Sequence, residues 1–154
     1  MDFLQTQHEI SSATEWKGHD LISARGLSRE QIDSILEQAR QIEGNPGAHK
    51  RSLEGRILAT LFFEPSTRTQ FSFQTAAYKL GGQVISLSGS ANSSIAKGET
   101  LGDTIKLVAE CADAIVIRHS KEGSAQLAAQ AARVPVINGG DGANQHPTQA
   151  LLDL

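Results

Sequence analysis

Hydroxyl groups and a guanidinium occur together in the tetrapeptide Ser66-Thr67-Arg68-Thr69, which follows an apolar stretch. Pro65 restricts the residue before it to extended geometry and serine is a favoured N-cap residue, so a helix is expected to begin at Ser66. The first turn of a helix has backbone N–H groups without intrahelical partners, and the helix dipole there favours negative charge. Because the dipole contributes only about 0.3–1 kcal/mol, Arg68 must supply much of the affinity, by bidentate contact with an oxyanion such as phosphate. The pattern predicts an anion site, although by itself it also fits a well-capped helix with a surface arginine.

Polar groups also follow three other apolar stretches. They are the serine-rich segment 88–97, which ends in Lys97, the pair Arg118-His119, and the run His146-Pro147-Thr148-Gln149. The sequence has no Walker-type phosphate loop, dinucleotide glycine spacing or Gly-x-Ser-x-Gly elbow, and its histidines lack metal-ligand spacing. No cofactor or metal is therefore expected. The remaining inventory of hydrogen-bond donors around an anion suits the stabilisation of charge that develops during a group transfer.

Apolar runs and helical periodicities alternate along the chain. Strands are expected at 56–63, 83–87, 113–119 and 134–138, and helices at about 28–43, 66–80, 99–111, 124–133 and after His146. This alternation predicts one α/β domain over residues 1–154: an open parallel sheet with helices on both faces, a four-stranded αβα sandwich. Ligands of such sheets bind beyond the carboxyl ends of the strands, and every polar segment described above is expected at that edge.

Some details of packing are also expected from local patterns. Ser28 and Gln31 predict a capping box at the first helix. The buried face of that helix is expected at Ile32, Ile35, Leu36, Ala39 and Ile42, and apolar spacing in the helix after Ser66 is carried by Phe71, Ala76, Ala77 and Leu80. Residues 139–144 are expected to form a glycine-rich loop.

Composition limits the class of protein. The chain has 154 residues and a net charge of −3, without a basic run, which argues against nucleic acid as a main partner. No apolar run approaches membrane-spanning length and no signal-peptide pattern is evident, so no membrane partner is expected and a cytoplasmic location is the simplest interpretation. The single cysteine, Cys111, indicates a reducing compartment and is expected to be a buried structural thiol.

Four ordered motifs resemble the catalytic chains of the aspartate carbamoyltransferase family, and the resemblance spans about residues 16 to 154. The motifs are Phe63-Glu64-Pro65-Ser66-Thr67-Arg68-Thr69, Lys97-Gly98-Glu99-Thr100, Val116-Ile117-Arg118-His119 and the run from Asn144 to Leu154. Ornithine carbamoyltransferases share the Ser-Thr-Arg-Thr and His-Pro-x-Gln elements. They usually have lysine in place of Pro65 and lack the second and third forms, so the aspartate enzyme is favoured.

The resemblance implies a role for each motif. Ser66, Thr67, Arg68 and Thr69 would bind the phosphate of carbamoyl phosphate, and Arg118 would reach both phosphate and carbonyl oxygen. His146, with Thr69 and Arg118, would polarise the carbonyl, and Gln149 would accept a hydrogen bond from the carbamoyl NH2. The amino group of aspartate would then attack, forming a tetrahedral oxyanion from which phosphate leaves. From the residues alone, His146 also fits an N-cap before Pro147 and Arg118 a surface charge at a strand end.

The resemblance further implies a homotrimer in which Lys97 and the serine before it, Ser94 in preference to Ser93, complete the site of a neighbouring subunit. Regulatory or dihydroorotase subunits are further partners that it admits. The family continues beyond the position of Leu154 into an aspartate-binding domain, so the chain is expected to be the carbamoyl-phosphate-binding domain alone, able to bind but not to turn over. Alternatives are a non-catalytic structural homologue and another transcarbamoylase, such as ornithine carbamoyltransferase.

One pair of residues departs from the family pattern. Gln70 and Gln74 occupy positions where many relatives carry arginine and glutamate. The two lie four apart on one helix face, so an amide pair is expected to replace an ion pair.

Overall fold

The computed structural model describes residues 16, 18–89 and 99–154. Helices and strands alternate through this part of the chain. In order they are α2 (Arg29–Gly44), β1 (Ile57–Phe62), α3 (Thr67–Lys79), β2 (Gln83–Ser88), α4 (Leu101–Ala109), β3 (Ala114–His119), α5 (Ser124–Ala131), β4 (Val136–Asp141) and α6 (Pro147–Leu152). Each helix of this set is too short or too polar to span a membrane.

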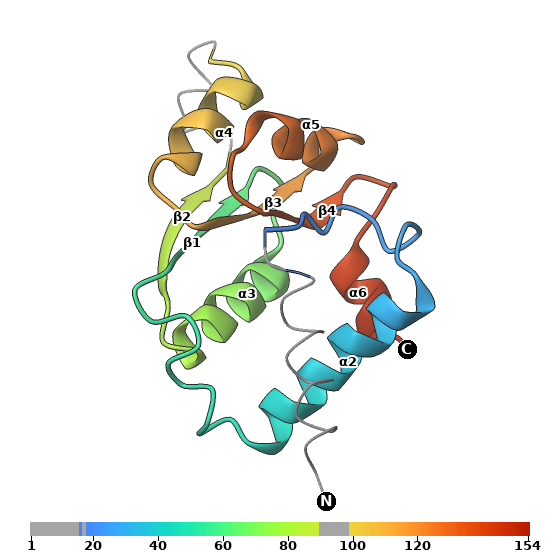
Figure 1. Cartoon of the computed structure of the whole chain (residues 1–154). Helices are drawn as coiled ribbons and strands as arrows, with labels where there is room; N and C mark the ends of the chain where they lie inside the picture. Colours follow the sequence, from blue (N-terminus) through green and yellow to red (C-terminus); the bar gives the residue numbers. More distant parts are fainter. Residues whose placement is uncertain (1–15, 17, 90–98) are drawn as a thin grey trace, which may run out of the picture.

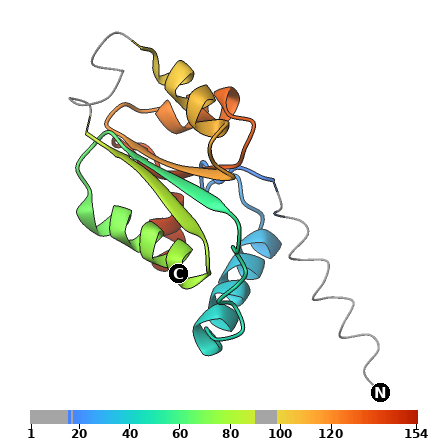
Figure 2. The same ribbon diagram turned by 90° about the vertical axis from the view of Figure 1, so that its left-hand side faces the viewer.

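The strands form one parallel sheet with the order β2-β1-β3-β4. Helices α4 and α5 cover one face of the sheet, and α3 and α6 lie on the other (Figures 1 and 2). The predicted α/β sandwich is confirmed. It forms because the central strands β1 and β3 are short apolar runs that must be covered on both faces, and helical crossovers between parallel strands supply that cover.

The main core lies between the sheet and the α4–α5 layer. Ile115 and Ile117 of β3 point into it, and both are almost completely buried. They meet Ile105 of α4 and the small side chains Ala125 and Ala128 of α5, which let that helix approach the sheet closely. Val116, between the two isoleucines, is equally buried but on the opposite face, because side chains alternate along a strand.

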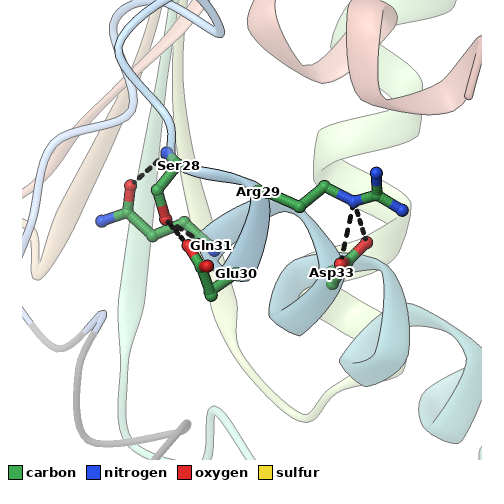
Figure 3. Close-up of polar contacts among 5 residues, drawn as sticks. All are labelled: Ser28, Arg29, Glu30, Gln31 and Asp33. Atoms are coloured by element: carbon green, nitrogen blue, oxygen red, sulfur yellow. Dashed lines mark hydrogen bonds and ion pairs between the residues drawn. The ribbon is translucent and has the colours of Figure 1, made fainter.

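Helix α2 begins with the predicted capping box (Figure 3). The Gln31 backbone N–H donates to Ser28 Oγ at 3.2 Å, and the Ser28 N–H donates to Gln31 Oε1 at 2.8 Å. One turn further, Arg29 and Asp33 form an exposed ion pair at 3.0 Å. These local contacts define the start of the helix without any help from the sheet.

The predicted buried face of α2 is wrong. No residue of this helix is buried within the described part of the chain. Ala39 is exposed, and the four larger apolar side chains are only half-buried. The apolar spacing identified a face correctly but carried no information about the surface that would cover it.

The apolar residues of α3 behave similarly. Of the four that mark the predicted spacing, only Ala77 is buried, while Phe71 points outward with 61% of its surface exposed. Cys111 is exposed as well, so its assignment as a buried thiol is wrong. Helix α4 ends at Ala109, and Cys111 therefore lies in the following turn instead of on the inner face of the helix.

Strand β4 extends further than expected. The sequence predicts a strand at 134–138 followed by a glycine-rich loop, whereas the strand runs to Asp141. A register irregularity between Ile117 and His119 of β3 brings His119 opposite Asp141. Gly139 and Gly140 therefore belong to the edge strand β4 and not to a loop. The loop was predicted because glycine usually weakens a strand.

Candidate functional site

The connections after the two central strands leave the sheet in opposite directions. From β1 the chain passes into α3 on one face, and from the neighbouring β3 it passes into α5 on the other. In an open parallel sheet, such a switch point creates a crevice beyond the carboxyl ends of the strands. The residues at this crevice are Ser66–Thr69, which follow β1, and Arg118 near the end of β3.

The start of α3 leaves donors available. Ser66 occupies the N-cap position, as predicted, but its side chain makes no capping hydrogen bond to the described helix. The first intrahelical bond runs from the Gln70 N–H to the Ser66 carbonyl oxygen at 3.0 Å. The N–H groups of the preceding turn and the Ser66 hydroxyl can therefore serve a ligand, which is the arrangement that an anion site requires.

A cleft of about 430 Å³ lies between α3 and α6. Its lining residues include Arg68, Thr69, His146 and Gln149, which the sequence places in two widely separated motifs. The structure thus brings together four of the predicted site residues. Ser66 and Thr67 adjoin them along the chain. Ser93, Ser94 and Lys97 lie outside the described residues.

Arg118 lies at the sheet edge with its side chain 20% exposed. Its Nη1 donates to the Gly139 carbonyl oxygen at 2.9 Å, and its Nη2 lies 3.6 Å from Glu64 Oε1. The buried Nε has no hydrogen-bond partner among the described residues. The side chain is therefore held by Gly139 and faces Glu64, so it is not simply a solvated surface charge.

Gly140 makes room for Arg118. Its φ of +120° is unfavourable for other residues, and a Cβ at this position would lie 2.5 Å from Arg118 Nη1. Only glycine fits the close approach of this guanidinium to the β4 backbone.

His146 precedes α6 at the N-cap position, but its side chain makes no capping hydrogen bond to that helix. The ring Nδ1 lies 3.3 Å from Thr148 Oγ1. Burial lowers the pKa of His146, and the positive charge of Arg118 lowers it further. A neutral imidazole keeps one N–H donor and one acceptor, so His146 suits hydrogen bonding to a carbonyl oxygen without carrying a full charge.

Asp141 organises the loop that carries His146, a role that sequence reasoning missed. Its carboxylate is 1% exposed and accepts four hydrogen bonds. The donors are the side chains of Asn138 and Asn144 and the backbone N–H groups of Gly123 and Gln145. Burial acts to raise the pKa of this carboxyl, but the four donors outweigh it and the pKa is lowered. The signal for this role in the sequence is a single carboxylate between Asn138 and Asn144, in a run rich in turn-forming residues.

The family model for the carbamoyl-phosphate-binding domain of aspartate/ornithine carbamoyltransferases matches residues 19–154. The chain belongs to this carbamoyltransferase family. The aspartate carbamoyltransferase catalytic subunit of Thermococcus onnurineus is 56% identical over 142 residues, covering 91% of this chain and 46% of that protein. The corresponding subunit of Methanothrix thermoacetophila is 58% identical over 139 residues, covering 90% and 46%.

Solved structures of aspartate transcarbamoylases are also similar to this chain. The catalytic subunit of M. jannaschii aspartate transcarbamoylase has a TM-score of 0.82 and 52% identity, over 88% of this chain and 45% of that one. Trypanosoma cruzi aspartate transcarbamoylase in complex with carbamoyl phosphate and aspartate has a TM-score of 0.84 and 40% identity, over 90% and 44%. The resemblance predicted from the four motifs is confirmed. The chain spans about half the length of the curated relatives it matches.

Proposed function

We propose that this chain supplies the carbamoyl-phosphate-binding domain of an aspartate carbamoyltransferase. The reaction moves the carbamoyl group of carbamoyl phosphate to L-aspartate, giving N-carbamoyl-L-aspartate and phosphate, a step of pyrimidine biosynthesis. The observation that carries the proposal is the cleft in which Arg68, Thr69, His146 and Gln149 meet. The positive charge of Arg118 lies near enough to His146 to lower the pKa of that histidine. The names of the relatives supply the identity of the two substrates.

Phosphate binds, in this proposal, at the start of α3. The hydroxyls of Ser66, Thr67 and Thr69, the N–H groups of the first turn and the Arg68 guanidinium would act as donors to it. The guanidinium of Arg118, near the end of β3, would supply further donors to the same anion. Opposite charge and charge-assisted hydrogen bonds together hold the leaving group.

The carbonyl group is then polarised by Thr69, Arg118 and His146, and Gln149 accepts from the carbamoyl nitrogen. When the amino group of aspartate attacks, negative charge develops on the carbonyl oxygen. Donors already aimed at that oxygen stabilise the charge without reorganising. Removing one such donor typically costs about 10²–10³ in rate.

Residues 1–154 are proposed to form one domain, and the aspartate carboxylates would bind to a second domain. The direct test joins this chain to the second half of the Thermococcus onnurineus subunit. We expect this chimera to carbamoylate aspartate and not ornithine, while residues 1–154 alone bind phosphate but show no sustained turnover. A folded chimera that transfers to neither amine would support a non-catalytic homologue, and transfer to ornithine would identify a different transcarbamoylase.

A homotrimer with a shared site is the second part of the proposal. The family resemblance supports this part, and the exposed apolar side chains of Phe71 and Tyr78 on α3 are available for a contact between subunits. In a cyclic trimer each subunit uses a different patch on each side, so Lys97 and Ser94 can complete a neighbouring site. Regulatory or dihydroorotase partners and a cytoplasmic location stay predictions.

Mixing two inactive variants of the chimera tests the shared site. Lys97→Ala and Arg118→Ala trimers are dissociated, mixed and reassembled. Part of the activity should return, because some sites in mixed trimers receive Lys97 and Arg118 from intact copies. Hybrid trimers that form but stay inactive would show that both residues act within one chain.

A further inference from the structure

A seam of polar side chains connects α3 to strands β1 and β2. Gln70 and Gln74 of α3 face Thr60 of β1 and Ser86 and Ser88 of β2. Helix and sheet usually meet through apolar side chains, so a polar seam at this place needs a reason. The expected amide pair between the two glutamines is not what the structure shows, because both amides donate to hydroxyls of the strands instead.

Gln70 uses both of its amide hydrogens on β2. Its Nε2 donates to Ser86 Oγ at 2.9 Å and to Ser88 Oγ at 2.8 Å. Ser88 is the last residue of β2. The side chain thus ties the beginning of α3 to the carboxyl end of the edge strand.

Gln74 makes the same number of bonds one helical turn later. Its Nε2 donates to Thr60 Oγ1 at 3.1 Å and to Ser86 Oγ at 3.2 Å, and those two hydroxyls are 3.0 Å apart. Thr60 is completely buried, so this end of the seam satisfies polar groups within the sheet. Both glutamines therefore donate two hydrogen bonds. Gln70 adjoins the first turn of α3, whereas Gln74 lies one turn further along the helix.

The backbone of Gln70 closes the first turn of α3, at which phosphate is proposed to bind. Its N–H bonds to the Ser66 carbonyl oxygen, so the turn between these residues contains Thr67, Arg68 and Thr69. The Ser66 side chain does not cap this helix, which leaves the turn without its usual side-chain anchor. The side chain of Gln70 is thus fixed to β2, while its backbone N–H closes the turn that begins at Ser66.

We propose that Gln70 is a positioning residue for the anion site, whose side-chain amide anchors the first turn of α3 to β2 while the Ser66 hydroxyl stays free for the ligand. The proposal rests on the proposed function for the identity of the anion, but not for the mechanical role of the tie. Gln74 belongs to the same seam and serves packing only. The difference between the two residues makes the proposal testable.

The test compares Gln70→Met with Gln74→Met in the 154-residue chain. Each variant removes two hydrogen bonds and keeps the length of the side chain. The probe is inorganic phosphate, with affinity measured by calorimetry. We expect Gln70→Met to raise the dissociation constant about tenfold and Gln74→Met to change it less than twofold, although Gln74→Met, which removes a partner of the buried Thr60, lowers the melting temperature at least as much.

A second measurement needs no ligand. Hydrogen exchange of the Gln70 backbone N–H should accelerate about tenfold in Gln70→Met and stay unchanged in Gln74→Met. The variant Gln70→Glu should keep the exchange slow, because its carboxylate accepts from the two serine hydroxyls. Its added negative charge should still weaken phosphate binding, and salt should reduce that difference.

Equal effects of the two methionine variants on phosphate affinity and on exchange would overturn the proposal. A wild-type chain that binds no phosphate would contradict the proposed anion site instead. In that case the exchange comparison alone still decides whether Gln70 holds the turn: selective acceleration in Gln70→Met supports the tie, and its absence overturns it.

Discussion

Replacing Arg68 with alanine is expected to weaken the binding of inorganic phosphate to this chain by about 100-fold. A hydrogen bond to a charged group contributes about 1.5–3 kcal/mol, and a bidentate contact contains two such bonds. A loss of about 3 kcal/mol corresponds to about two orders of magnitude in the dissociation constant. The helix dipole and the remaining hydroxyls are too weak to compensate. Calorimetric titration with phosphate measures the difference.

Arg51→Ala is the matched control for this experiment. Arg51 is an exposed arginine, paired with Glu54, in the segment that precedes β1 and therefore at the opposite end of that strand from Arg68. Its removal changes the net charge by the same amount, so affinity should fall less than twofold. If Arg68→Ala binds phosphate as well as the wild type does, the anion does not bind at the start of α3.

Asp141→Asn is expected to destabilise the folded chain by about 3 kcal/mol. The substitution replaces one acceptor oxygen by an NH2 group, which then faces two donors that were bonded to the carboxylate. Each unpaired buried donor costs about 1–3 kcal/mol. For a domain of this size, the melting temperature should fall by about 6–12 °C in a calorimetric scan. Asp33→Asn, which removes half of an exposed ion pair, should lower it by less than 2 °C.

The same experiment has a defined pH dependence. Because the pKa of Asp141 is lowered from its ordinary value of 3.8, the ionised carboxylate stabilises the fold at neutral pH. That contribution is complete above pH 3.8 and is lost as the pH falls through the lowered pKa. The stability difference between wild type and Asp141→Asn should therefore narrow in acid. A gap that stays constant down to the acid unfolding of both proteins would mean that the charge of Asp141 is not involved.

The order of elements and the location of the site were predictable from sequence because both depend on local patterns. Alternating strands and helices imply a parallel sheet, and a parallel sheet implies that Ser66, Arg118 and His146 meet at one edge. The capping box at Ser28 was predictable for the same reason, since its partners lie three residues apart. These inferences needed only the chemistry of neighbours along the chain.

What the sequence did not reveal depends on contacts between distant segments. Helical spacing predicts that Gln70 pairs with Gln74, but the hydrogen-bond partners of Gln70 are Ser86 and Ser88 of strand β2. Asp141 lies in a run that resembles an ordinary turn, and one of its donors, Gly123, comes from the start of α5. The apolar face of α2 was identified but not what covers it. Apolar periodicity shows which face of a helix is apolar, but it does not show which element packs against that face.

The order of strands in the sheet also means that the proposed anion site exists only in the assembled fold. Its groups lie after β1, within β3 and after β4, so the site is complete only when these three strands have assembled. A partially folded chain that lacks β3 or β4 therefore contains the Ser66 turn but no Arg118 or His146 beside it. Phosphate bound as proposed would prefer the complete fold to such intermediates, and by mass action it would shift the population toward the complete fold. In the proposed function, phosphate would therefore stabilise the fold as well as leave the carbamoyl group, and the stabilisation would increase with phosphate concentration.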